Sequence, residues 1–283
     1  MTSAEQAGGS AVLQPRTGRR RSPRQRAQRV RVVSYALGAA VLAALVLVPD
    51  WPRIQRNFLD GGVFADQFPK IVTIAARNTV VYTVLSFTGG LVLGLTMALL
   101  RLSTIRPYRW FAAVYIEIFR GLPALLTISL IGFAIPIALG VGFPVVLGVE
   151  TGGIIALSLV AGAYMAETIR AGIEAVPRGQ MEAARSLGMP YGQAMRSIVI
   201  PQAFRIIIPP LTNELVLLLK DTALLSILGV TVTSKELTKF ARDGVNQNFN
   251  GTPIVAAGLL YLAITIPLTR LVAQLEKRNR RSR

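Results

Sequence analysis

In this 283-residue sequence, the long apolar stretch over residues 206–230 contains three charged side chains and two hydroxyl groups whose spacing could form a site. Glu214 and Asp221 are seven residues apart, so in a helix they lie two turns apart on nearly the same face. Lys220 directly precedes Asp221, and Thr222 and Ser226, four residues apart, could line a polar strip. Charges in such a stretch are costly and mark pathways or structural pairs. Opposite charges suit a zwitterion such as an amino acid; alternatively, neighbouring helices or a partner chain satisfy them.

Two other pairs of opposite charge lie near the ends of apolar stretches. Glu117 and Arg120, three residues apart, can pair on one helix face, and the Gly-Leu-Pro sequence at 121–123 would interrupt a membrane helix there. A broken helix exposes backbone groups that can face a ligand or line a cavity. A packing kink, with Arg120 reaching the membrane surface, fits equally well. For Glu167 and Arg170 we expect a structural or coupling clasp rather than a ligand site.

The composition excludes several kinds of chemistry. There is no cysteine and no histidine, which removes disulfides, thiolate or imidazole metal sites and histidine-activated nucleophiles. No GxxxxGK(S/T) phosphate loop occurs, so any ATP must be bound by another chain. The formal net charge of +17 is concentrated beside apolar runs, as expected of cytoplasmic membrane flanks. Since basic and aromatic residues are not interleaved, we expect no nucleic-acid partner.

Apolar residues fill whole segments instead of recurring with a helical or strand period. They make up 52% of the sequence, and the mean hydropathy is +0.50. The stretches long enough to cross a bilayer are residues 32–48, 79–100, 111–139, 153–171, 206–230 and 253–272. We expect residues 64–76 to form a helix at the membrane interface after a turn at 60–62. Gly90 and Gly94 should allow close helix packing. The sequence therefore predicts an all-α integral membrane protein with six transmembrane helices.

The charges of the loops predict which side of the membrane each loop faces. Both basic termini and the arginine-containing loops 101–110 and 172–205 are expected in the cytoplasm. Residues 140–152 carry no lysine or arginine, and residues 49–78 and 231–252 are of mixed charge, so these loops are expected outside. The alternation agrees with six spans.

A polar, helix-forming segment, EAVPRGQMEAARSL, occupies residues 174–187 of the second cytoplasmic loop. Gly188 tolerates left-handed geometry and Pro190 cannot continue a helix, so we expect a turn there. A second helix should cover residues 191–199 and end near Pro201. This helix–turn–helix is either a plain surface loop or a helix presented to a groove on a partner protein.

The spacing of residues in this loop resembles the EAA loop of ABC importer permeases, E-A-A-x3-G-x9-I-x-L-P. The matching residues are Glu182, Ala183, Ala184, Gly188, Ile198 and Pro201. The one departure is Ile200 where leucine is usual. Residues 119–123, 163–173 and 219–226 resemble the corresponding stretches of polar amino-acid permeases. The resemblance covers about residues 70–275.

The resemblance implies the membrane permease of a bacterial ABC importer that takes up a polar amino acid by alternating access. In that family the EAA loop docks into a cleft on a cytoplasmic ATPase. Here Gly188 would set the bend, Ala183 and Ala184 would allow close contact, and Glu182 would offer a charge. The implied partners are an ATPase dimer holding ATP and Mg²⁺, a second permease (the same chain or a sister), an extracellular substrate-binding protein and membrane lipid. This chain would bind no cofactor and catalyse no reaction itself.

The expected organisation adds an N-terminal helix to the five-helix core of that family. It comprises a basic, disordered tail (1–32), the extra helix (33–48), the permease domain (64–275) with its coupling loop (174–201), and a basic tail (276–283). Three rival functions remain open from the residues. They are an ABC permease for an opine or organosulfur compound, a secondary transporter driven by an ion gradient, and a membrane scaffold that recruits partners through its basic tail.

Overall fold

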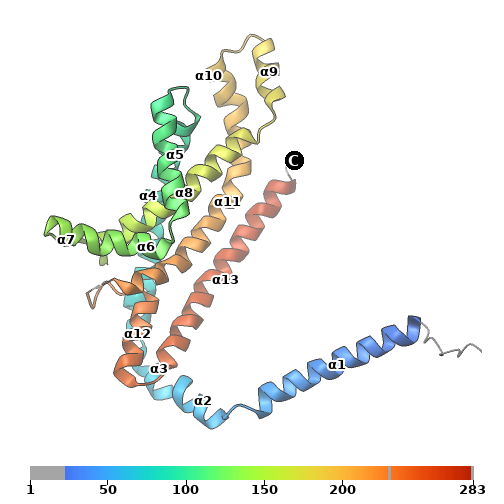
Figure 1. The fold of residues 1–283 in the computed structure, drawn as a ribbon, viewed down its shortest axis with the longest axis vertical. Coiled ribbons are helices and arrows are strands. Elements are labelled where there is room, and N and C mark those ends of the chain that lie inside the picture. The colour runs from blue at the N-terminus through green and yellow to red at the C-terminus, as the bar shows by residue number, and fades with distance from the viewer. Residues whose placement is uncertain (1–22, 229–230, 282–283) are drawn as a thin grey trace, which may run out of the picture. The chain divides into compact units, whose positions relative to one another are not determined.

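The fold, a computed structural model, is described over residues 23–228 and 231–281 (Figure 1). The chain forms two units, residues 1–52 and residues 53–283. Within the described residues, five helices are long and apolar enough to cross a membrane, or six if a bent pair forms one span. The predicted all-α membrane fold is therefore confirmed.

The first unit contains one long helix, α1 (Pro23–Leu47), of which residues 30–47 are apolar enough to cross a membrane. The prediction of a disordered tail is therefore wrong for residues 23–32. These residues include four arginines and two glutamines, which favour helix, and they run without a break into the apolar segment. The first 22 residues of the predicted tail lie outside the described residues.

Most of α2 and every later element belong to the second unit. In chain order these are α2 (Trp51–Phe58), α3 (Gly61–Gln67), η1 (Ile71–Ala76), α4 (Arg77–Leu102), α5 (Arg106–Gly121), α6 (Ala124–Ser129), η2 (Leu130–Ala134), α7 (Ile135–Leu139), β1 (Val145–Val146), β2 (Val149–Glu150), α8 (Thr151–Glu174), α9 (Arg178–Ser186), α10 (Tyr191–Ala194), η3 (Met195–Val199), α11 (Ile200–Asp221), η4 (Thr222–Ile227), α12 (Leu237–Asn248) and α13 (Thr252–Arg281). Within this unit α8 packs against α4 and α11, and α11 packs against α13. The α9–α10 hairpin lies at one end of these helices, and α3 and α12 lie at the other (Figure 1).

Glycines bring α4 and α8 into close contact. A Cβ atom added at Gly94 would lie 2.7 Å from the Met165 Cβ and 3.1 Å from the Ala166 nitrogen. One added at Gly90 would lie 3.1 Å from the Ala161 Cβ. Because any larger residue would push the two backbones apart, the packing predicted for these two glycines is confirmed.

The segment before α4 differs from the prediction of an interfacial helix over residues 64–76. Helix α3 ends at Gln67, and from Ile71 onward the chain already belongs to the continuous span 71–102. The sequence IVTIAA of η1 is apolar, and its side chains pack against α12 and α13. The turn predicted at residues 60–62 is present as the N-cap of α3, where the Asp60 carboxylate accepts hydrogen bonds from the Gly62 and Val63 amides.

The predicted span 111–139 is broken where the sequence indicated. Helix α5 ends at Gly121, and the helical segments after Pro123 continue at an angle of 105° to it. Proline at position 123 cannot donate a backbone hydrogen bond to the preceding turn, which separates the two halves. The second half ends at Leu139, followed by Gly140 in the left-handed region (φ +66°).

The second helix of the hairpin does not end near Pro201 as predicted. Helix α10 passes through the π-helical turn η3 directly into α11, so one helical path leads from Tyr191 to Ile227. Pro201 lies in the first turn of α11, where a missing amide donor is tolerated. The Gln202 side chain also donates to the Ile198 carbonyl oxygen at 3.0 Å, which supports the π-to-α transition.

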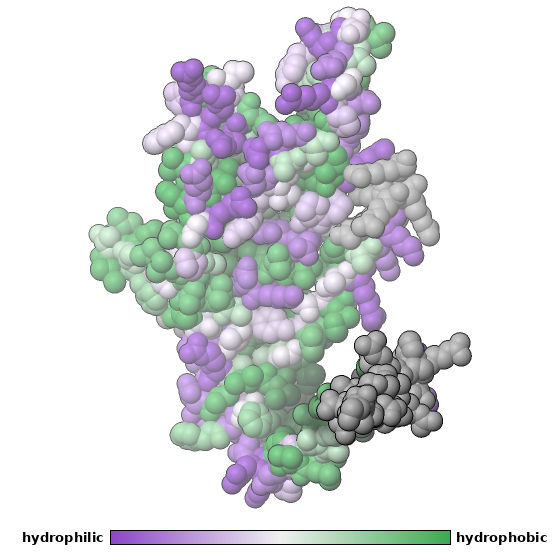
Figure 2. Space-filling view, turned by 45° about the vertical axis from the view of Figure 1, so that its right-hand side comes forward, coloured by the Kyte–Doolittle hydropathy of each residue, from purple (hydrophilic) through white to green (hydrophobic). Residues whose placement is uncertain are grey.

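The polar loops of the second unit lie at its two ends, and an apolar surface lies on α7. Loops 101–110 and 172–205 lie at the hairpin end, and residues 231–252 lie at the opposite end (Figure 1). Figure 2 shows hydrophilic residues gathered over the end that carries α5 and the hairpin, and hydrophobic residues over α7. On α7 the side chain of Ile137 is 81% exposed, as expected of a surface that contacts lipid or another chain.

Candidate functional site

The turn of the α9–α10 hairpin is fixed by a Schellman motif. The Gly188 amide donates to the Arg185 carbonyl oxygen at 3.0 Å, and the Met189 amide donates to the Ala184 carbonyl oxygen at 3.1 Å. Gly188 has φ +85°, a conformation that glycine adopts without penalty. Pro190 then caps α10. The glycine therefore sets the bend, as the sequence indicated.

The residues of the matched loop pattern divide into exposed and buried groups. Glu182, Ala183, Gly188 and Pro201 are exposed, and Ile198 is half-buried. Ala184 is only 2% exposed, so it packs inside the hairpin, and its part in a contact with an ATPase stays a prediction. A short helix needs one face to pack on, and α9 packs against α10 and η3, where Ala194 is also buried.

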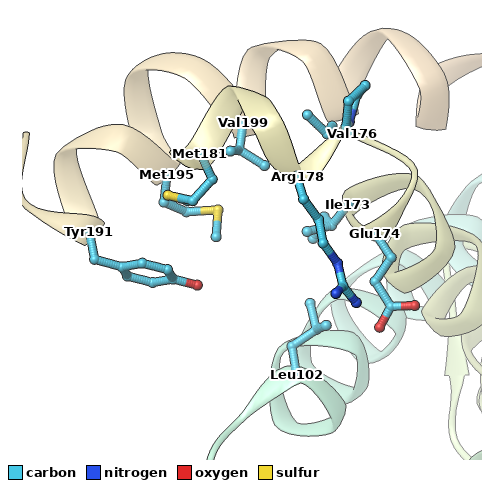
Figure 3. A pocket seen from close by; sticks show the side chains of 10 residues that line it. Leu102, Ile173, Glu174, Val176, Arg178, Met181, Tyr191, Met195 and Val199 are labelled. Carbon is cyan, nitrogen blue, oxygen red and sulfur yellow. The ribbon is translucent and has the colours of Figure 1, made fainter. Parts of the chain in front are cut away.

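An open groove of about 560 Å³ lies beside the hairpin (Figure 3). Met181, Met195 and Val199 approach it from the hairpin, and Leu102 lies across it at the end of α4 (Figure 3). The other lining residues are Ile173, Glu174, Val176, Pro177, Arg178 and Tyr191. Methionine side chains adapt their shape readily, so this face can repack when the hairpin moves.

A second pocket, of about 290 Å³, lies between α6, α8 and α11. Glu214 and Asp221 both line it, as their seven-residue spacing predicts. Its other lining residues are Ala124, Leu157, Val160, Ala161, Tyr164, Leu217 and Leu218. The lining is thus mostly apolar, with two carboxylates and one phenol, as in sites that hold small molecules.

Three other residues of the same stretch do not share this pocket. Lys220 is exposed and lies outside the lining, so it is not paired with Asp221 there as a substrate clamp would require. Thr222 is buried and donates its hydroxyl to the Leu219 carbonyl oxygen at 2.7 Å. The predicted strip with Ser226 is wrong because η4 is a 3₁₀-helix, in which residues four apart point about 120° apart.

The predicted pair of Glu117 and Arg120 is not formed in the described part of the chain. Both side chains are exposed, and the Arg120 guanidinium instead lies over the Tyr164 ring, 5.5 Å from its centroid. A cation over an aromatic face is attracted by the ring quadrupole. Arg120 therefore stands beside the pocket that Tyr164 lines, without lining it itself.

The clasp predicted near the end of α8 is present. The Arg170 guanidinium bonds both carboxylate oxygens of Glu167, and its Nη1 donates to Glu174 Oε2 at 2.5 Å. Glu174 also lines the groove beside the hairpin. The arginine thus joins three positions on the last turns of α8, immediately before the chain enters the hairpin.

Sequence reasoning missed Tyr164 as a residue of the pocket. It is the one aromatic residue of α8, in a helix otherwise rich in alanine, glycine and aliphatic residues. Its position three residues before Glu167 offered a weak signal. The apolar groove residues Met195 and Val199 gave no signal, because only the folding of the hairpin brings them opposite Leu102.

Comparisons with known proteins agree on one family. The profile described as binding-protein-dependent transport system inner membrane component matches residues 90–281. The chain is 35% identical over 220 residues to the arginine transport system permease protein ArtQ of Bacillus subtilis, covering 78% of this chain and 97% of that protein. It is 37% identical over 212 residues to a putative glutamine transport system permease protein GlnP of Rickettsia bellii, covering 74% and 94%.

Solved structures show the same fold. An amino acid ABC transporter crystallised with histidines matches with a TM-score of 0.70 and 34% identity, over 77% of this chain and 98% of that one. The MetNI methionine ABC transporter matches with a TM-score of 0.62 at 18% identity, over 75% and 97%. The expected resemblance to the permeases of ABC importers for amino acids is therefore confirmed. This chain belongs to the binding-protein-dependent transport system inner membrane components, the multi-pass permease subunits of ABC importers.

Proposed function

We propose that this permease carries a polar amino acid into the bacterial cell by alternating access, and that the substrate passes through the pocket between α6, α8 and α11. The observation that carries the proposal is the presence of Glu214 and Asp221 in this one apolar pocket. A substrate ammonium group needs anionic partners when it leaves water, and carboxylates supply them.

The pocket favours a substrate with a positively charged side chain. Among the described residues that line it, none is a lysine or an arginine. One carboxylate is enough to pair with the α-ammonium group of the substrate, so the second carboxylate can pair with a positively charged substrate side chain. Arg120, held over the Tyr164 ring at 5.5 Å, is the nearby cation that can meet the substrate carboxylate. The curated relative ArtQ is named for arginine.

The hairpin end is the cytoplasmic end in this proposal. The basic loops lie there, as the positive-inside rule requires, and both chain termini would be cytoplasmic. Glu182, Ala183 and Gly188 would contact a dimeric ATPase, which would hold ATP and Mg²⁺. A second permease chain and an extracellular binding protein would complete the importer. Lys220, exposed on α11, would face that second permease or a water-filled path, because lipid contact of a charge is costly.

The proposal is tested by uptake into proteoliposomes that contain the permease, its ATPase and its binding protein. We expect arginine or lysine to compete best with labelled substrate, glutamine less well, and glutamate least. Asp221→Asn and Glu214→Gln should each lower uptake of the cationic substrate by about tenfold or more, because a charge-assisted hydrogen bond is lost.

Asp66→Asn is the matched control, since Asp66 is exposed and lies outside the pocket. It should leave uptake unchanged. Uptake of cystine alone would favour the organosulfur alternative, which one relative named for L-cystine, TcyB of Bacillus subtilis, also represents at 34% identity. Full activity of a variant lacking both carboxylates would refute the assignment of the pocket.

A further inference from the structure

A short segment between η4 and α12, here called the strap (Thr231–Glu236), is held against the start of α4. The Asn78 side chain, fully buried, donates to the carbonyl oxygens of Thr233 at 2.7 Å and Lys235 at 3.1 Å. One turn further along α4, the Tyr82 hydroxyl donates to the Ser234 carbonyl oxygen at 3.4 Å. Two residues of one transmembrane helix therefore bind three successive carbonyl groups of the strap.

The loop that carries the β-strands holds the strap from a second side. Glu150 Oε1, at the end of β2, accepts hydrogen bonds from the Thr231 amide at 3.2 Å and the Ser234 hydroxyl at 3.4 Å. The Glu150 amide in turn donates to the Tyr82 hydroxyl at 3.0 Å. Tyr82 thus links the strap, α4 and the strand in one network, and Ser234 at its centre is completely buried.

The last strap residue attaches the strap to α12 and α13. Glu236, 1% exposed, accepts from the Lys239 amide at 2.5 Å and the Thr238 amide at 2.6 Å, and from the Tyr261 hydroxyl at 3.1 Å. The Lys235 ammonium group pairs with Asp243 of α12 at 2.6 Å. Glu236 is thus the N-cap of α12, and water would hydrate its buried carboxylate if the strap moved away from α13.

The position of the strap in the chain connects it to the pocket. Helix α11 ends with the pocket residue Asp221, and η4 leads from there toward the strap. Leu225 of η4 packs in the same core cluster as Tyr82. The contacts that hold the strap are hydrogen bonds to backbone carbonyls and carboxylates and one ion pair, and water can replace each of them when the strap moves away.

We propose that the strap is the outer gate of the permease, closed in this structure, and that Asn78, Tyr82 and Glu236 are the positioning residues that hold it closed. This inference rests on the proposed transport function and its orientation in the membrane. When the importer opens outward, the strap leaves α4, and substrate delivered from outside can reach the pocket. The gate requires no particular substrate, so it can be tested separately from the identity of the amino acid.

The first test uses cysteine accessibility, because the chain contains no cysteine of its own. Ser234→Cys places a thiol at the buried centre of the strap, and Val232→Cys places one at a position that is 73% exposed. The reagent is a membrane-impermeant maleimide added outside proteoliposomes that contain the complete importer. At rest, S234C should react at least about tenfold more slowly than V232C, since its labelling requires local opening.

Trapping the ATPase with ATP and vanadate in the presence of binding protein should raise the S234C rate toward that of V232C. Asn78→Asp, which removes the donor of both carbonyl hydrogen bonds, should raise the resting S234C rate about tenfold. Asn57→Asp is its matched control, because Asn57 also donates to a backbone carbonyl, that of Arg53, on an exposed helix. It should leave the rate unchanged.

A covalent lock gives an independent readout. The Leu237 amide donates to the Thr79 hydroxyl at 3.1 Å, so Thr79→Cys with Leu237→Cys brings two buried thiols close together, and a small diffusible oxidant can join them as a disulfide while the gate opens and closes. The disulfide should abolish uptake, and its reduction should restore uptake, while each single variant stays active. S234C labelling that never changes through the ATP cycle, or full uptake by the cross-linked importer, would overturn the gate. Gate opening without uptake of any amino acid would instead refute only the proposed substrate.

Discussion

Three glycines of the α9–α10 hairpin can show what holds its bend. We expect alanine to destabilise the hairpin at one of these positions and to stabilise it at the other two. A Cβ atom at Gly179, Gly188 or Gly192 would meet no neighbouring atom within 4 Å, so packing does not distinguish them. Only Gly188 has a positive φ, of +85°. Gly188→Ala should therefore destabilise the bend by about 1–2 kcal/mol, the penalty of an L-residue in the left-handed region. Gly179→Ala and Gly192→Ala should stabilise their helices by up to about 1 kcal/mol.

These changes in free energy can be measured as changes in the hydrogen-exchange protection of backbone amides. The Met189 amide, bonded to the Ala184 carbonyl oxygen at 3.1 Å, reports the bend itself. Since about 1.4 kcal/mol is a factor of ten, its protection should fall about 5- to 30-fold in G188A. Protection in G179A and G192A should stay equal or rise. The same G188A protein should import less substrate per ATP hydrolysed, because a straighter hairpin no longer fits the ATPase.

Two outcomes would refute this reasoning. Unchanged protection of the Met189 amide in G188A would mean that the left-handed conformation is not what holds the turn. Equal loss of coupling in G179A would mean that the hairpin responds to any added methyl group, and that the bend is not the feature that the ATPase recognises.

Further predictions concern packing and pH. Gly94→Ala should lower the stability of the detergent-solubilised protein by about 1–3 kcal/mol, because its Cβ would lie 2.7 Å from the Met165 Cβ; thermal unfolding should show this against Gly258→Ala, which meets nothing within 4 Å. Burial raises the pKa of the Glu236 carboxyl from its ordinary value of 4.5 to about 7, despite opposing hydrogen bonds from the Thr238 and Lys239 amides. The raised pKa belongs to the closed strap, so protonation stabilises closure below about pH 4.5 and this stabilisation is lost as the pH rises through 7. Labelling of S234C should therefore increase between external pH 6 and pH 8, and Glu236→Gln should abolish that dependence; a pH-independent rate in the parent protein would contradict it.

Features governed by local chemistry could be predicted from the sequence. Gly188 and Pro190 form the turn that their backbone preferences predict, and the helix breaks at the Gly-Leu-Pro sequence of residues 121–123. The seven-residue spacing of Glu214 and Asp221 placed both in one pocket because α11 stays regular over those two turns.

The wrong predictions come from packing between elements. Pro201 was expected to end a helix because it lacks an amide donor. A π-helical turn directly precedes it, and the chain continues as α11. The spacing of Thr222 and Ser226 suggested one face, but the chain tightens into a 3₁₀-helix where η4 meets α12. The strap was read only as a loop of mixed charge, because the partners of its carbonyl groups are more than 150 residues away in sequence.

The continuity of α11 has a mechanical consequence for recognition. Its 22 residues form a rod of about 33 Å, so a tilt of about 10° at the hairpin would displace the far end by about 6 Å. Pro209 and Pro210 weaken the rod near its middle, because neither can donate to the preceding turn. Glu214 and Asp221 both lie beyond this joint. Any motion of this half of α11 would therefore move the two carboxylates together relative to Tyr164 of α8, with their mutual spacing preserved.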